Sequence, residues 1–180
     1  MVSLRGRQEP LKQRYREEPE AARITLTVRS DPAVLGDPMH SRVGSEVASF
    51  DAGAHPGVGG TGELACSGDV LLAALAACQE ITLKMVAANM GIELEDVKVT
   101  VVGDLDLRGT LGMDRNVEVG FEGIRCEVRV KTSSDPERAR RFFEKAEQFC
   151  VVLNTLRKPL SVETSFAVEA ESRPAAETPA

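Results

Sequence analysis

Residues 67–91, SGDVLLAALAACQEITLKMVAANMG, contain the most apolar run of the chain and decide its fold. Ser67 is suited to cap a helix N-terminus, Asp69 complements the helix dipole, and Gly91 supplies a stop, so the segment predicts about six helical turns. Apolar residues occupy most positions of the first half, which predicts burial on nearly all sides. Such a helix should lie in the middle of its domain.

Segments with alternating apolar and polar residues lie on both sides of this helix. The expected strands are residues 23–29, 40–50, 96–107, 121–132 and 160–168. The side chains expected to face inward on the first two strands are Ile24, Leu26, Val28, Val43 and Val47. A second helix should start at Pro136, capped by Ser134 or Asp135. The order predicts an α+β domain with helices packed against antiparallel sheets.

Composition and charge place these elements in one globular domain. The chain has 180 residues, of which 42% are hydrophobic, and a net charge of −6. We expect a charged N-terminal arm over residues 1–21, a single domain over 22–170 and a disordered tail over 171–180. The negative charge argues against nucleic-acid binding. The N-terminus lacks a signal-peptide pattern, so we expect a cytoplasmic protein with no membrane partner.

Four cysteines are the candidate nucleophiles. Cys78 lies on the apolar face of the long helix, and Cys150 follows the apolar stripe of the second helix. Cys66 stands at a loop–helix junction, and Cys126 alternates with apolar residues on a strand, which predicts a core position. Any one of them could be a buried small hydrophobe, because free cysteine is among the most buried residue types. The absence of CxxC or CxxH spacing argues against a zinc site.

Two of the cysteine contexts together resemble a known family. The small-residue run AALAAC ending at Cys78, behind a glycine-rich loop, resembles the central helix of the OsmC/Ohr hydroperoxide reductases. About seventy residues later, AEQFC at residues 146–150 resembles the family pattern AExxC around a second cysteine. The resemblance extends from Ile24 to Glu169 and includes the order of strands and helices.

The resemblance implies a thiol peroxidase without metal or organic cofactor. Cys78 would attack an organic or fatty-acid hydroperoxide and become a sulfenic acid, which Cys150 would resolve as a disulfide. A dithiol of the lipoyl type would then reduce the enzyme. The family fold also implies an intertwined homodimer, whose sheets wrap around two paired central helices and whose active sites lie at the subunit boundary.

The resemblance further implies that an arginine activates the first cysteine and that a glutamate orients the arginine. Arg42 matches the arginine best by position, with Arg23 and Arg29 as rivals. The family's acidic position is not acidic here, and Glu63 in the same loop is the candidate substitute. Val151 stands where the family has a proline after the second cysteine.

These departures leave other functions open. The chain could be a non-catalytic protein that binds a small apolar ligand under its glycine-rich loop, or a redox sensor that signals through a Cys78 disulfide. Cys66 could act as an alternative resolving thiol or pack under the loop. His55, in the same loop, could be a surface residue or a polar contact over the site.

Overall fold

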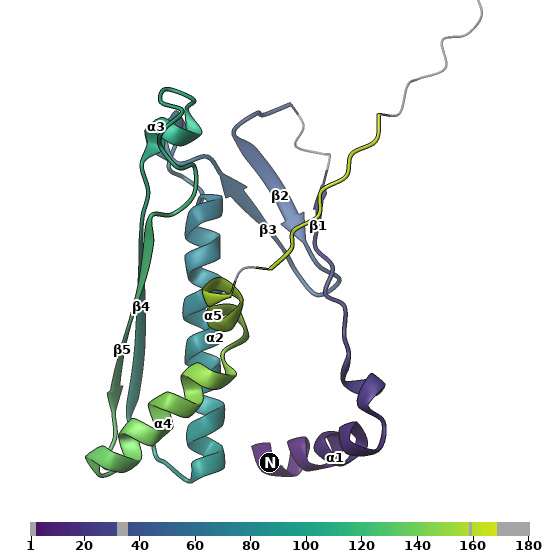
Figure 1. Ribbon diagram of the computed structural model, residues 1–180, viewed down its shortest axis with the longest axis vertical. Helices are drawn as coiled ribbons and strands as arrows, with labels where there is room; N and C mark the ends of the chain where they lie inside the picture. Colours follow the sequence, from purple (N-terminus) through teal and green to yellow (C-terminus); the bar gives the residue numbers. More distant parts are fainter. Residues whose placement is uncertain (1–2, 32–35, 159, 169–180) are drawn as a thin grey trace, which may run out of the picture.

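The long helix predicted from residues 67–91 forms and is the axis of the fold (Figure 1). This helix, α2, spans Ser67–Met90, and Gly91 ends it in the left-handed conformation with φ of 62°. Its N-cap is Cys66 and not Ser67: the Cys66 thiol accepts from the Asp69 amide, and the Asp69 carboxylate accepts from the Cys66 amide. The computed structural model describes residues 3–31, 36–158 and 160–168.

A two-stranded antiparallel sheet lies against one side of α2, and two further helices pack beside it (Figure 1). The sheet pairs β4 (Asp96–Asp104) with β5 (Gly123–Lys131), and the short helix α3 (Leu107–Thr110) lies between these strands in sequence. Helix α4 (Pro136–Phe149) begins at the predicted cap Asp135 and is followed by α5 (Val151–Arg157). The largest buried cluster consists of Leu83, Val86, Ala87, Ile92, Phe142 and Ala146.

The N-terminal part forms a helix and a separate three-stranded sheet. Its elements are α1 (Leu4–Glu17), η1 (Pro19–Ala22), β1 (Arg29–Asp31), β2 (His40–Gly44), β3 (Ser49–Gly53) and η3 (Pro56–Val58). The single strand expected over 40–50 is wrong, because the Ser45 amide bonds the Ala48 carbonyl and closes a hairpin turn. Val47 sits in this turn and is 93% exposed instead of facing inward.

Two more expected strands do not form in the single chain. Only Arg29–Asp31 is a strand near the first predicted segment, and Ile24, Leu26 and Val28 are exposed. Residues 160–168 have no strand, and their large apolar side chains are also exposed. A strand is stable only when a neighbour pairs with it, and among the described residues neither 23–28 nor 160–168 pairs with a strand. The tail expected over 171–180 lies outside the described residues.

The predicted burial of α2 on nearly all sides is wrong for one chain. In the first half of the helix only Leu75 is buried. An apolar stripe at helical spacing is exposed on the opposite side: Ala73, Ala74, Ala77 and Ile81. By length and composition α2 could also cross a membrane, a test that core helices of globular proteins pass as well. A stripe of this kind is a surface that another element can cover.

Candidate active site

The structure brings Cys78 and Cys150 together. Cys78 lies on α2, while Cys150 is the corner residue at which α4 ends and α5 begins. Their sulfur atoms are 3.5 Å apart, with the Cys150 thiol donating to the Cys78 sulfur. Both are free thiols. A disulfide requires the sulfurs to approach by about 1.5 Å more.

The surroundings shift the pKa values of the two thiols in opposite directions. Burial acts to raise the pKa of Cys78, but hydrogen bonds outweigh it and bring that pKa below the ordinary thiol value. The donors are, in order of effect, the Val152 amide, the Cys150 thiol, the Val151 amide and the Thr82 hydroxyl. Burial raises the pKa of Cys150 above the ordinary value. Cys78 is therefore the better thiolate nucleophile, and Cys150 stays a neutral proton donor.

Two polar side chains one helical turn beyond the cysteines hold this arrangement. The Asn154 amide donates to the carbonyls of Glu147, Gln148 and Cys150 at 3.0, 3.2 and 2.8 Å, which fixes the corner between α4 and α5. The Thr82 hydroxyl donates to the Cys78 carbonyl at 2.7 Å. Neither residue was predicted from the sequence. Their position four residues after a cysteine in a helix was the available signal.

The two residues expected to activate Cys78 lie elsewhere in the single chain. Arg42, on β2, is about half exposed and pairs with Asp51 at 3.7 Å. Glu63 is exposed, and its amide donates to the Thr61 hydroxyl at 3.3 Å. Among the described residues of one chain, no arginine is a cause of the lowered Cys78 pKa. In the single chain, the amide, thiol and hydroxyl donors named above stabilise the Cys78 thiolate.

The other two cysteines have separate roles in the fold. Cys66 caps α2, and its sulfur accepts from the Asp69 amide at 3.4 Å. Cys126 on β5 packs in the apolar cluster around the thiol pair, which confirms its predicted core position, and burial raises its pKa. His55 accepts from the Gly57 amide at 3.0 Å. Within the described residues, no three His, Cys, Asp or Glu side chains form a group that could hold a metal ion.

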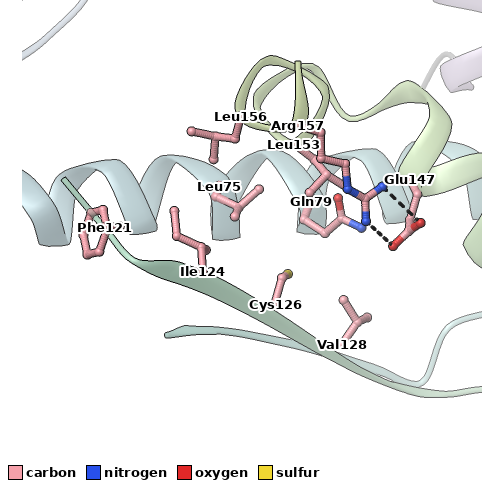
Figure 2. A pocket seen from close by; sticks show the side chains of 10 residues that line it. All are labelled: Leu75, Gln79, Phe121, Ile124, Cys126, Val128, Glu147, Leu153, Leu156 and Arg157. Carbon is pink, nitrogen blue, oxygen red and sulfur yellow. Dashed lines mark hydrogen bonds and ion pairs between the residues drawn. The ribbon is translucent and has the colours of Figure 1, made fainter. Parts of the chain in front are cut away.

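A cavity of about 400 Å³ is lined by residues of α2, β5 and α5 (Figure 2). Leu75 and Leu153 belong both to its wall and to the buried cluster that contains Cys150 and contacts Cys78. The full lining is Leu75, Gln79, Phe121, Ile124, Cys126, Val128, Glu147, Leu153, Leu156 and Arg157. The thiol pair therefore has apolar neighbours on the side of this cavity.

The chain combines an α+β fold with a pair of thiols, one on the central helix and one at the corner between two later helices. Comparison with known proteins places this combination in one family. The model of the OsmC-like protein family matches residues 60–165, more than half of the chain. The chain belongs to the OsmC-like family. No curated protein sequence matches it at a significant level.

Solved structures share the fold at low sequence identity. An OsmC-like protein from Mycoplasma pneumoniae superposes with a TM-score of 0.61 at 18% identity, covering 74% of this chain and 88% of that one. Organic hydroperoxide resistance proteins from Legionella pneumophila and Elizabethkingia anophelis each give a TM-score of 0.56 at 22% identity over 76% of this chain. These matches cover 91% and 90% of the respective proteins. The expected OsmC-like α+β fold is thereby confirmed.

Because the pKa values of the two thiols shift in opposite directions, the cysteines should be alkylated in a defined order as the pH rises. Because alkylation consumes the thiolate, labelling of Cys78 by iodoacetamide should rise with pH through a midpoint below that of an ordinary thiol. Labelling of Cys150 and Cys126 should lag behind, since burial raises their pKa values. Pulse labelling and peptide mass spectrometry would measure the order. In guanidinium, where the protein is unfolded, the three cysteines should be labelled at equal rates. Equal rates in the folded protein as well would contradict the predicted order.

Proposed function

We propose that this protein reduces organic hydroperoxides to alcohols through Cys78 and Cys150. The observation that carries the proposal is the 3.5 Å contact between one thiol with a lowered pKa and a second with a raised pKa. A thiol peroxidase of this type needs one thiolate to attack the peroxide and a second thiol close enough to condense with the sulfenic acid, and the pair has this arrangement. Family membership and relatives named organic hydroperoxide resistance proteins support the same chemistry.

The proposed cycle consumes one hydroperoxide and one external dithiol and regenerates the two protein thiols. The Cys78 thiolate attacks the distal oxygen of ROOH, the O–O bond breaks, and RO⁻ takes a proton to leave as ROH. The resulting Cys78 sulfenic acid condenses with the Cys150 thiol, forming the S–S bond and releasing water. An external dithiol, for which we propose a lipoyl-type carrier, reduces the disulfide by two exchange steps and leaves as its own cyclic disulfide.

The apolar surroundings support organic substrates over hydrogen peroxide. The thiol pair is embedded in a cluster that includes Leu75, Leu153, Val101 and Ile124. Burying an alkyl group in such surroundings gains about 0.8 kcal/mol for each methylene. Hydrogen peroxide has no apolar part and gains nothing of this kind. Long alkyl or aryl hydroperoxides, including those of fatty acids, are therefore the proposed substrates.

We also propose that two chains form an intertwined homodimer. Three apolar surfaces are uncovered in one chain: the stripe on α2 defined above, the segment 23–28 and the segment 160–168. A second copy has the segments needed to cover the stripe and to pair with these extended residues. The N-terminal sheet of one chain would then lie against the thiol pair of the other. In that arrangement Arg42 would supply the activating charge and Glu63 would orient it.

The dimer makes a prediction about mass in solution. Sedimentation equilibrium at micromolar concentration should give twice the chain mass of 19.4 kDa. Ala77→Glu places a charge in the middle of the stripe on α2 and should shift the population to monomer. Met113→Glu, at an exposed position in the turn after α3, is the matched control and should remain dimeric. A wild-type mass of one chain would refute the dimer.

The test of the proposed function is turnover. Wild-type protein with cumene hydroperoxide or a fatty-acid hydroperoxide and dihydrolipoamide should consume peroxide over many cycles. Without the reductant, one equivalent of peroxide should lower the protein mass by two hydrogens, and peptide mapping should locate a Cys78–Cys150 disulfide. Consumption with no such disulfide would exclude the two-cysteine cycle. Absence of consumption would instead favour a binding or sensing role.

A further inference from the structure

The corner between α4 and α5 presents consecutive backbone amides to the two sulfur atoms. Only Cys150 separates the two helices, it is extended with φ of −75° and ψ of 108°, and no side chain of the described residues caps the start of α5. The first amides of α5 have no partners inside that helix and are free to bond other acceptors. The Val151 and Val152 amides donate to the Cys78 sulfur, and the amide of the next residue donates to the thiol at the corner. The direction of these amides depends on the angle of the corner.

Asn154 ties the two sides of this corner together. Its side-chain nitrogen donates to the carbonyls of Glu147 and Gln148, near the end of α4, at 3.0 and 3.2 Å. The same nitrogen donates at 2.8 Å to the Cys150 carbonyl, which also accepts the Asn154 backbone amide at 3.0 Å. These bonds satisfy carbonyls that α4 leaves without helical donors. Within the described residues, neither thiol accepts a hydrogen bond from Asn154.

A second tie across the same corner is exposed to solvent. The Arg157 guanidinium on α5 pairs with the Glu147 carboxylate on α4 at 3.3 Å, and the two side chains are 55% and 49% exposed. Exposed ion pairs contribute little to stability because water and salt screen them. Neither of these two charges is a cause of the lowered pKa of Cys78. Of the two ties, the half-buried Asn154 is therefore the one expected to hold the corner.

We propose that Asn154 is a positioning residue for the reaction of Cys78: by fixing the corner, it holds the first two amides of α5 in line with the sulfur. This role rests on the proposed function, in which Cys78 is the nucleophile. A hydrogen bond weakens steeply when it bends or lengthens, so a small turn of α5 removes the two donors. Burial then dominates, the pKa of Cys78 rises, and less of the thiol is ionised at neutral pH. Asn154 controls the nucleophile without contacting it.

The test is the pH profile of Cys78 alkylation by iodoacetamide in Asn154→Leu, which removes the amide and keeps a side chain of similar size. The midpoint should move to higher pH, and the rate at neutral pH should fall about tenfold, the loss expected for hydrogen bonds to an ionised group. Above both midpoints, variant and wild type should react within about threefold of each other, because the reactivity of a thiolate changes only slightly with its pKa. A loss of accessibility alone would lower the rate by the same factor at every pH.

Two further variants make the result specific. Arg157→Gln breaks the exposed ion pair at the same corner and should keep the wild-type midpoint. Val151→Pro removes one donor to Cys78 at the first residue of α5, where proline is compatible with a helix, and should raise the midpoint by a smaller amount. This variant tests the route through the amides even if Asn154→Leu fails to fold.

Circular dichroism identifies the variants that are folded. A wild-type midpoint in folded Asn154→Leu would overturn the proposal, and so would an equal change in Arg157→Gln or an unchanged midpoint in Val151→Pro. The alkylation measurements use no peroxide. The expected profiles in a protein that consumes no hydroperoxide would contradict the proposed function alone, whereas turnover with unaltered profiles would contradict only the role of Asn154.

Discussion

Cys78→Ser should lower the rate of hydroperoxide reduction by about 10⁴-fold or more, the loss typical of removing an enzyme's nucleophile. A serine hydroxyl at this position is protonated at neutral pH, so the four donors around it have no anion to stabilise. Peroxide consumption coupled to dihydrolipoamide oxidation measures the effect. A residual rate within tenfold of wild type would remove Cys78 from the mechanism.

Substitution of the second thiol, Cys150, should cause a different defect. Cys150→Ser should still react once with peroxide, because the attacking thiolate remains, and then stop as a Cys78 sulfenic acid that dimedone traps. Cys126→Ser is the matched control, since this residue lies in the same cluster without contacting Cys78 by a hydrogen bond. It should retain multiple turnovers. Loss of the first oxidation in Cys150→Ser would mean that the assigned roles are incorrect.

Phe142→Ala should cause the largest loss of stability among single substitutions, about 3–5 kcal/mol in the free energy of unfolding. Phe142 is fully buried between α4 and the C-terminal half of α2, and its removal leaves a cavity against Leu83, Val86 and Ala146. Urea denaturation followed by circular dichroism measures the change. Because the site lies in the larger cluster and away from the thiols, Cys78 reactivity should be preserved at low urea.

A surface substitution provides the control for this loss. Met113→Ala removes a side chain that is exposed in the turn after α3, and it should change the unfolding free energy by no more than about 0.5 kcal/mol. A loss below about 1 kcal/mol for Phe142→Ala would show that the core relaxes to fill the space.

Elements with a strong local signal were predictable from the sequence. The range of α2 follows from its apolar run and from Gly91, and α4 follows from Asp135 and Pro136. The long alternating strands β4 and β5 also form as expected. In each case the capping group or the alternation is contained in the segment itself, so no distant partner is needed to predict it.

Features that depend on distant partners were not predictable in the same way. The alternation of residues 23–29 is real, but a strand also needs a neighbour, and within the described part of one chain residues 23–28 have none. The proximity of Cys78 and Cys150 came from the family resemblance, because a separation of 72 residues has no local signal. The amide donors at Val151 and Val152 depend on the corner between two helices, which side-chain patterns do not encode.

The position of Cys150 at the start of α5 links two properties of the molecule. Leu153, Leu156 and Arg157 on this helix also form part of the cavity wall, so the second thiol and the cavity wall belong to the same element. By thermodynamic linkage, a ligand that prefers the dithiol form tenfold raises the reduction potential of the pair by about 30 mV at saturation. The oxidation state of the thiols would then report the concentration of a molecule that never reacts with them.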